Sequence, residues 1–126
     1  MAAPNIVGVT TIIGITTMRS LGDTAATTLV SNAAGSGYVY KINTILVAND
    51  DGSSAADITV SLNDQDDGAG TAHKLGHTLS VAADSTLVVI DKASAIYLEE
   101  DRSIVVTASA GGDLAVICSY EQIESA

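Results

Sequence analysis

The acidic segment Asp64-Gln65-Asp66-Asp67-Gly68 carries the residue types that bind hard cations. Clustered carboxylates before a glycine turn supply oxygen ligands of the kind that Ca²⁺ prefers. A full EF-hand loop also needs a bidentate glutamate after the glycine, and the residues after Gly68 do not provide one. Two interpretations stay open, a solvated turn and a cation site, and the solvated turn is favoured. We therefore assign no metal site from the sequence.

Two histidines stand four positions apart, at His73 and His77, with Gly76 between them. On a helix this spacing would place both rings on one face, but the surrounding residues are typical of a strand. Four strand residues span about 13 Å, which is too far for both rings to bind one ion directly. A histidine metal pair is not expected.

The carboxylates Glu99, Glu100 and Asp101 are adjacent in the chain. Paired carboxylates can perform acid–base catalysis in a cleft. Neighbouring residues point their side chains apart, however, and no aromatic platform for a sugar accompanies them. This segment is interpreted as a solvated turn.

Cys118 is the single cysteine, so the chain cannot form an internal disulfide. The alternation of residues places it on the same strand face as Val116 and Tyr120, which predicts a buried and inert thiol. The sequence also contains no glycine-rich phosphate loop and no Ser/His/Asp set at a useful spacing. We expect a protein that is not an enzyme and needs no cofactor.

The net charge of −10, from 15 acidic against 5 basic residues, excludes some partners. Nucleic acids and anionic membrane surfaces require clustered Lys and Arg. The first residues, Met1 to Asn5, lack the basic start of a signal peptide, and the apolar runs are shorter than the ~20 residues that span a membrane. We expect a soluble protein made in the cytoplasm, with no nucleic-acid or membrane partner.

Short apolar segments that alternate with Thr, Ser and Asn follow one another along the 126 residues. Turn signals recur at intervals of about 8–12 residues, which is typical of an antiparallel β-sandwich or barrel. The sequence predicts an all-β, antiparallel β-sandwich, jelly-roll-like or Ig-like, of eight or nine short strands. Asp51-Gly52 and Gly111-Gly112-Asp113 are read as hairpin turns, and Leu87–Ile90 as a strand buried on both faces. The predicted core comprises Ile42, Leu46, Ile58, Val60, Leu62, Leu79, Val81, Leu87, Val89, Ile104, Val106, Leu114, Val116 and Cys118.

Apolar residues make up 47% of the chain, but Phe and Trp are absent. The core must therefore consist of aliphatic side chains, which favours burial of further surface between copies of the chain. Residues 1–20 carry no charge before Arg19, and they are expected to form an N-terminal strand or arm beside a sandwich domain of residues 21–126. An uncharged β-prone terminus must be paired or covered. The predicted protein–protein interface consists of Ile6, Val7, Val9, Ile12, Ile13 and Ile15.

The body of the chain carries a succession of simple motifs. Tyr38-Val39-Tyr40-Lys41-Ile42-Asn43 opens a strand that closes in Leu46-Val47-Ala48-Asn49, and Ile96-Tyr97-Leu98-Glu99-Glu100-Asp101 precedes a last segment that ends in Tyr120-Glu121. This order resembles small β-sandwich virion proteins of tailed bacteriophages, especially of marine and cyanobacterial phages. The resemblance extends from about Asn5 to Ile123.

The resemblance implies a virion structural protein, most directly a capsid decoration or cement protein on the capsid exterior. Its partners would be the major capsid protein and further copies of itself, as a homotrimer or alternatively a homodimer. A neck, tail or fibre protein is the second interpretation, and an extracellular carbohydrate-binding or adhesin-like module is a third from a different class.

Overall fold

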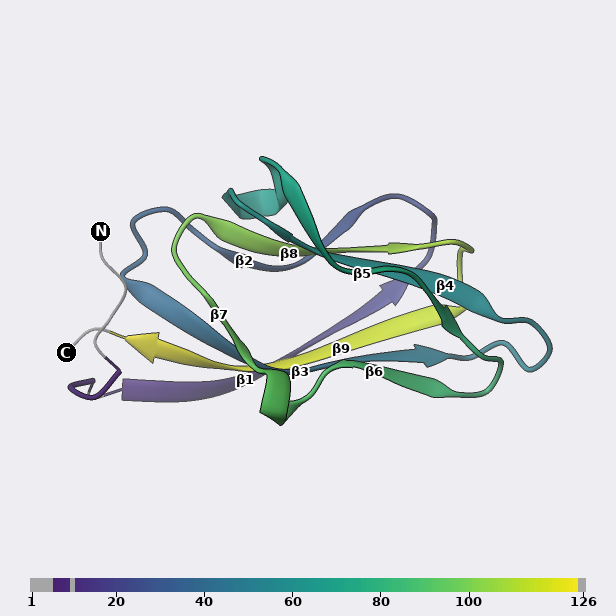
Figure 1. Cartoon of the computed structure of the whole chain (residues 1–126), viewed down its shortest axis with the longest axis horizontal. Helices are drawn as coiled ribbons and strands as arrows, with labels where there is room; N and C mark the ends of the chain where they lie inside the picture. The colour runs from purple at the N-terminus through teal and green to yellow at the C-terminus, as the bar shows by residue number, and fades with distance from the viewer. Residues whose placement is uncertain (1–5, 10, 125–126) are drawn as a thin grey trace.

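The computed structural model describes residues 6–9 and 11–124, and it shows two antiparallel sheets packed face to face (Figure 1). In sheet A the strand order is β1-β9-β3-β6, and β7 also pairs with β3; in sheet B the order is β2-β8-β4-β5. The predicted all-β sandwich is confirmed. The strands are β1 (Thr11–Leu21), β2 (Thr27–Asn32), β3 (Tyr38–Asn49), β4 (Ala56–Asn63), β5 (Ala72–Val81), β6 (Thr86–Ile90), β7 (Ile96–Leu98), β8 (Arg102–Ala108) and β9 (Leu114–Glu124). Two short 3₁₀ turns, η1 (Asp66–Gly68) and η2 (Lys92–Ser94), lie in loops.

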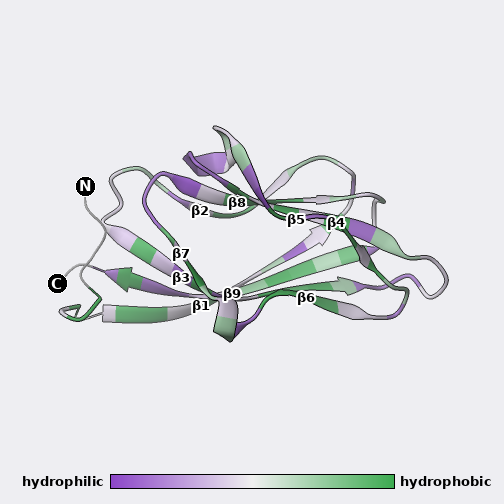
Figure 2. Ribbon diagram, viewed as in Figure 1, coloured by the Kyte–Doolittle hydropathy of each residue, from purple (hydrophilic) through white to green (hydrophobic). Residues whose placement is uncertain are grey.

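The core between the two sheets is aliphatic, as the composition predicts. Its most deeply buried side chains include Ile42, Ile45, Ile58, Leu98 and Ile104. Figure 2 shows hydrophobic residues along the strands of both layers and hydrophilic ones in the loop around η1. Burying each large aliphatic side chain contributes about 1.5–3 kcal/mol, so the sandwich is held together without large aromatic rings at its centre.

Most of the predicted core residues lie in the core. Nine are buried and four more, Leu62, Leu79, Leu87 and Val89, are partly buried against it. The exception is Leu46, which was expected on the same face as Ile42 and instead points outward. A β-bulge shifts the register of β3 against β9 between Ile42 and Thr44. Because an extra residue reverses the alternation of side chains, Ile45 and Val47 occupy the core in place of Leu46.

Two predicted hairpins are wrong. The segment Asn49–Ser54 connects β3 of sheet A to β4 of sheet B, and Gly111-Gly112-Asp113 connects β8 of sheet B to β9 of sheet A. Both turns are therefore arches between the layers. Turn residues show that the chain reverses, but they do not show which sheet the next strand joins. The consecutive strands β4 and β5 do form an antiparallel pair within one sheet.

Three buried asparagines hold the loops at the ends of strands. The Nδ2 of Asn32 donates to the carbonyl oxygens of Tyr38 and Leu98, each at 3.0 Å. Asn49 donates to the carbonyl oxygens of Ser54 and Val81, and Asn63 to those of Gly68 and Ala69. Buried amides of this kind are satisfied by the backbone, so these side chains stabilise the fold.

Candidate functional site

The predicted interface residues lie at the start of the chain and along β1. Ile6 and Val7 precede β1 and are exposed, and Val9 is half-buried. Within β1, Ile12 and Ile13 are exposed, whereas Ile15 is half-buried and lies opposite Tyr120 of β9. From Thr11 to Leu21 the strand pairs continuously with β9 of the same chain. In the single chain this segment is thus an edge strand of sheet A.

The outer face of sheet A carries an apolar row across four adjacent strands. Met18 lies opposite Ile117, Ile117 opposite Leu46, and Leu46 opposite Val88. Met18 and Val88 are exposed to 73% and 52%, respectively. A second row on the same face is formed by Ile12, Ile123 and Val39, of which only Ile12 is exposed while Ile123 and Val39 are buried.

Charges on this outer face are few, although the chain carries a net charge of −10. Lys41 of β3 and Glu121 of β9 occupy opposite positions in the register, so one positive and one negative residue are neighbours on this face. The neighbouring positions carry Thr16, Ser119 and Thr44. The face is nearly neutral on an acidic molecule, which suits it to contact with another protein.

Sequence reasoning missed the apolar row. Leu46 was placed in the core, and Val88 belonged to a run interpreted as buried on both faces. The interpretation of Leu87–Ile90 as a strand buried on both faces is wrong. Strand β6 lies at the edge of sheet A, where Val88 points to solvent while Leu87 packs inward. A four-residue apolar run does not reveal whether a strand is central or at an edge.

The acidic segment Asp64–Gly68 directs its carboxylates to different backbone and hydroxyl donors. Asp64 accepts from the amide of Thr71, Asp66 from the amide of Ala34, and Asp67 from the hydroxyl of Ser31. Within residues 6–9 and 11–124, no three His, Cys, Asp or Glu side chains are grouped so that they could hold a metal ion. These carboxylates order the loop around η1.

Among the adjacent carboxylates Glu99, Glu100 and Asp101, the last two accept hydrogen bonds from backbone amides of other loops. The carboxylate of Glu100 accepts from the amides of Gly35 and Gly37, at 3.1 and 2.9 Å. Asp101 accepts from the amide of Asp66. The turn between β7 and β8 is thus tied to two other loops at this end of the sandwich.

The two histidines are exposed on β5. The Nε2 of His73 lies 3.9 Å from the Oδ2 of Asp64, and His77 lies four residues further along the strand. An exposed pair of this kind contributes little to stability. The structure gives the histidines no shared site.

Cys118 lies in β9 with no exposed surface, between the two sheets. Burial raises the pKa of its thiol to about 12. Because the thiolate is the nucleophilic form, the thiol is inert near neutral pH, in line with the sequence-based prediction of burial.

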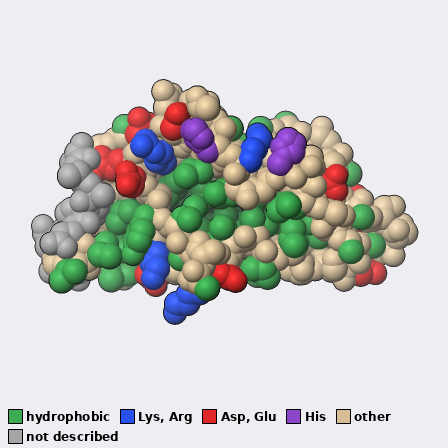
Figure 3. Space-filling model, viewed as in Figure 1, with side chains coloured by type: hydrophobic (Ala, Val, Ile, Leu, Met, Phe, Trp, Pro, Cys, Tyr) green, Lys and Arg blue, Asp and Glu red, His purple; other side chains and the backbone are tan. Residues whose placement is uncertain are grey.

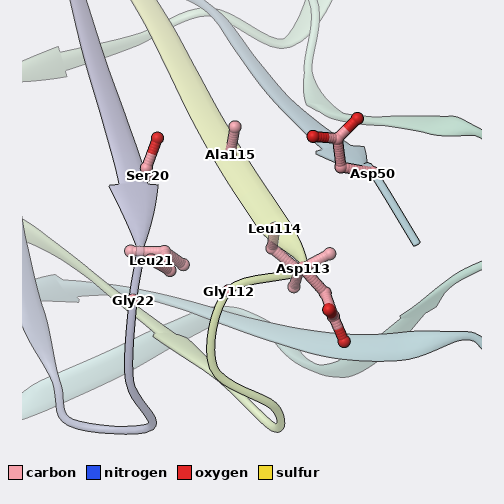
Figure 4. A pocket seen from close by; sticks show the side chains of 8 residues that line it. All are labelled: Ser20, Leu21, Gly22, Asp50, Gly112, Asp113, Leu114 and Ala115. Carbon is pink, nitrogen blue, oxygen red and sulfur yellow. The ribbon is translucent and has the colours of Figure 1, made fainter.

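A small pocket of about 80 Å³ lies where β1 ends and β9 begins (Figure 4). Asp50 and Asp113 are the carboxylates among its lining residues, and Figure 4 shows them directed apart. The amide of Asp50 donates to the carbonyl oxygen of Asp113, and the amide of Gly112 to that of Leu21. The pocket is a packing gap between two arches, without converging reactive groups.

The side of the sandwich seen in Figure 3 exposes a band of hydrophobic side chains between the two layers, with histidine and basic side chains above it. The edges on this side are β5 of sheet B and β6 and β7 of sheet A. Leu79, Leu87, Val89 and Ile96 pack only partly buried against the core. This side is a second apolar surface, with histidine and basic side chains beside it.

Within the described part of the chain no helix has the length and apolar character needed to cross a membrane.

No protein-family model and no curated protein sequence matches the chain. Among solved structures, it is similar to a chain of Bacillus endospore appendages, described as disulfide-linked pili, with a TM-score of 0.54 and 14% identity over 92% of this chain and 90% of that one. It is also similar to a chain of the acid-stable capsid of Helicobacter pylori bacteriophage KHP30, with a TM-score of 0.52 and 8% identity over 94% and 91% of the two chains. At these identities the likeness concerns the fold: this chain has the same kind of β-sandwich, over nearly its whole length, as these two proteins.

Proposed function

We propose that this chain is a non-enzymatic structural subunit of a phage virion, and specifically a capsid decoration or cement protein that binds the exterior of the head. The observation that carries the proposal is the nearly neutral apolar outer face of sheet A on a strongly acidic sandwich. A protein that works by contact needs such a face, whereas catalysis needs converging reactive groups. The sequence resemblance to small phage virion proteins supports the head as its location.

A pilus-like role receives less support. The structural neighbour from endospore appendages belongs to disulfide-linked pili, and a link of that kind requires an accessible thiol. The single cysteine of this chain, Cys118, is fully buried. Attachment through non-covalent contacts therefore fits this chain better.

The proposal is tested on particles of a phage that carries the gene. Purified particles are separated into heads and tails, and their proteins are identified by mass spectrometry. We expect the chain on intact heads in a fixed ratio to the major capsid protein. Recovery with the tails would instead favour the neck, tail or fibre interpretation, and absence from purified particles would refute a virion role.

The face is tested by rebinding purified protein to heads that lack it. Val88→Glu adds a charge to the apolar row, and Ser80→Glu adds the same charge to an exposed position of β5 in sheet B. We expect Val88→Glu to weaken binding about tenfold or more, which corresponds to about 1.4 kcal/mol, and Ser80→Glu to leave it unchanged. Equal binding of both variants would show that the apolar row does not contact the head.

A further inference from the structure

Four of the five strands at sheet edges carry features that discourage further pairing, and one of them, β7, has only three residues. The register of β5 with β4 shifts twice, Thr78 has a positive φ of 48°, and Lys74 lies on the strand. In β2 the register shifts near Leu29, and β6 has five residues and a register shift of its own. Bulges, short length and charge are the usual protections of an exposed sheet edge.

Strand β1 lacks these protections. It extends over 11 residues in one continuous register with β9. Its single charge, Arg19, lies near the end and donates to the carbonyl oxygen of Thr28. Within the described residues no strand pairs with the other side of β1. A long and regular edge with a single charge near one end is a template for a further strand.

The pattern of β1 is complementary to itself. Opposed residues in an antiparallel pair share a face, so a second β1 must align even-numbered residues with even-numbered ones to continue the outer face. When Ile15 lies opposite Ile15 of the second copy, Ile12 lies opposite that copy's Met18, and Met18 opposite its Ile12. The two most exposed apolar side chains of the strand are Ile12, at 56%, and Met18, at 73%. In this register each of them is covered by the other one from the second copy.

Other registers fit less well. With Thr16 at the centre, Ile12 would face Ser20 and Met18 would face Gly14. With Gly14 at the centre, Ile12 would face Thr16. The Ile15-centred register also places Arg19 opposite the uncharged Thr11, so that two cations do not meet.

We infer that two copies of this chain associate through their β1 edges, antiparallel and with Ile15 opposite Ile15, so that sheet A continues from one copy into the other. The pairing is isologous and closes as a dimer. It selects the homodimer over the homotrimer, because an edge that pairs with itself generates a twofold axis. The inference concerns the isolated protein and holds whether or not the chain is a head protein.

Cysteine cross-linking tests the register. Ile12→Cys and Met18→Cys are made separately, and the native Cys118 is buried and inert near neutral pH. After mild oxidation we expect a disulfide-linked dimer when the two variants are mixed, and little when either is oxidised alone. Cross-linking of either variant alone in preference to the mixture would overturn the register, and no cross-link in any sample would overturn the pairing.

Charge substitutions test the same contact without covalent chemistry. Ile12→Lys with Met18→Lys in one chain places like charges opposite each other twice, and Ile12→Lys with Met18→Glu places opposite charges there instead. By sedimentation equilibrium we expect the first variant to be monomeric and the second to dimerise. Circular dichroism confirms that each is folded, because both positions are exposed.

Val88→Lys is the matched control, since Val88 is 52% exposed on the same outer face but lies in β6 at the opposite edge. We expect it to dimerise like the unmodified protein. A monomeric unmodified protein at a concentration of hundreds of micromolar, a dimeric double-lysine variant or a monomeric Val88→Lys variant would each overturn the inference. Failure of the head-binding test would leave these outcomes unaffected, so the two proposals fail separately.

Discussion

At the scale of single residues, the acidic side chains that the sequence offered as candidate site residues form hydrogen bonds that stabilise the fold. Glu100 binds the amides of Gly35 and Gly37, and Asp66 binds the amide of Ala34. These bonds connect loops that are more than thirty residues apart in the chain. A sequence shows which residues are acidic, but it does not show which distant amides their carboxylates meet.

Cys118 gives the first prediction. Burial raises the pKa of its thiol from the ordinary value of 9.0 to about 12. The thiol in the unfolded chain therefore ionises before the folded one. This contribution to stability is complete below about pH 9 and is lost as the pH rises from there toward 12.

The difference in unfolding free energy between the unmodified protein and Cys118→Ala, followed by urea titration, is expected to shrink above pH 9. A thiol reagent is expected to modify Cys118 only after unfolding. Rapid labelling of the native protein at pH 8 would contradict the buried position.

Asn32 gives the second prediction. Asn32→Ala removes the donor that reaches the carbonyl oxygens of Tyr38 and Leu98. Leaving a buried polar group unpaired costs about 1–3 kcal/mol, and we expect a loss of about 2–4 kcal/mol in the free energy of unfolding. Asn43→Ala is the control, since the Oδ1 of Asn43 has no hydrogen-bond partner among residues 6–9 and 11–124. Equal losses in thermal or urea denaturation would show that the amide of Asn32 contributes little.

At the scale of elements, the number of strands was predicted as eight or nine and is nine in the described residues, but their pairing was not predicted. The alternation of apolar and polar residues indicates strands because it reflects burial along each segment. Pairing depends on contacts between segments far apart, such as β1 with β9 and β2 with β8. The bulge beside Asn43 shows the same limit, because one inserted residue moved Leu46 out of the core and no local signal marked it.

The arches between the sheets give the third prediction. A methyl group on Gly111 would come within 2.7 Å of the carbonyl oxygen of Gly22, which is backbone and cannot turn away. Gly111→Ala is expected to cost about 1–3 kcal/mol, as overpacking does. Gly22→Ala modifies the other partner of this contact, and its methyl group would meet no atom within 4 Å. Gly22→Ala is expected to be neutral or slightly stabilising in a thermal melt, and equal melting temperatures for the two variants would contradict the contact.

At the scale of the whole molecule, the residues predicted to form an interface share only Ile12 with the apolar outer face of sheet A, and their role stays a prediction. The uncharged start of the chain pointed to an interface, and Ile12 lies exposed on β1 as such a role requires. Met18, Ile117 and Val88 were not anticipated, because they come from three different strands. A surface assembled from separate strands becomes visible only when the sheet order is known.

The charge of the molecule gives the fourth prediction. Each copy carries a net charge of −10, so two copies repel each other, while the proposed contact contains no pair of opposite charges. Salt screens this repulsion, with a Debye length of about 10 Å at 0.1 M and about 30 Å at 0.01 M. We expect the dimer dissociation constant, measured by sedimentation equilibrium, to fall as NaCl is raised from low concentration to 0.15 M. A dissociation constant that rises with salt would indicate a contact held by ion pairs.

The tyrosines give the molecule an optical property. The chain has four Tyr and no Trp, so its intrinsic fluorescence is tyrosine emission. The rings of Tyr38 and Tyr40 lie 6.3 Å apart and those of Tyr40 and Tyr120 lie 5.0 Å apart, a spacing at which excitation passes between rings. Tyr120 of β9 lies opposite Ile15 of β1. The intensity and anisotropy of the tyrosine emission therefore report on whether β1 is paired with β9, without any added label.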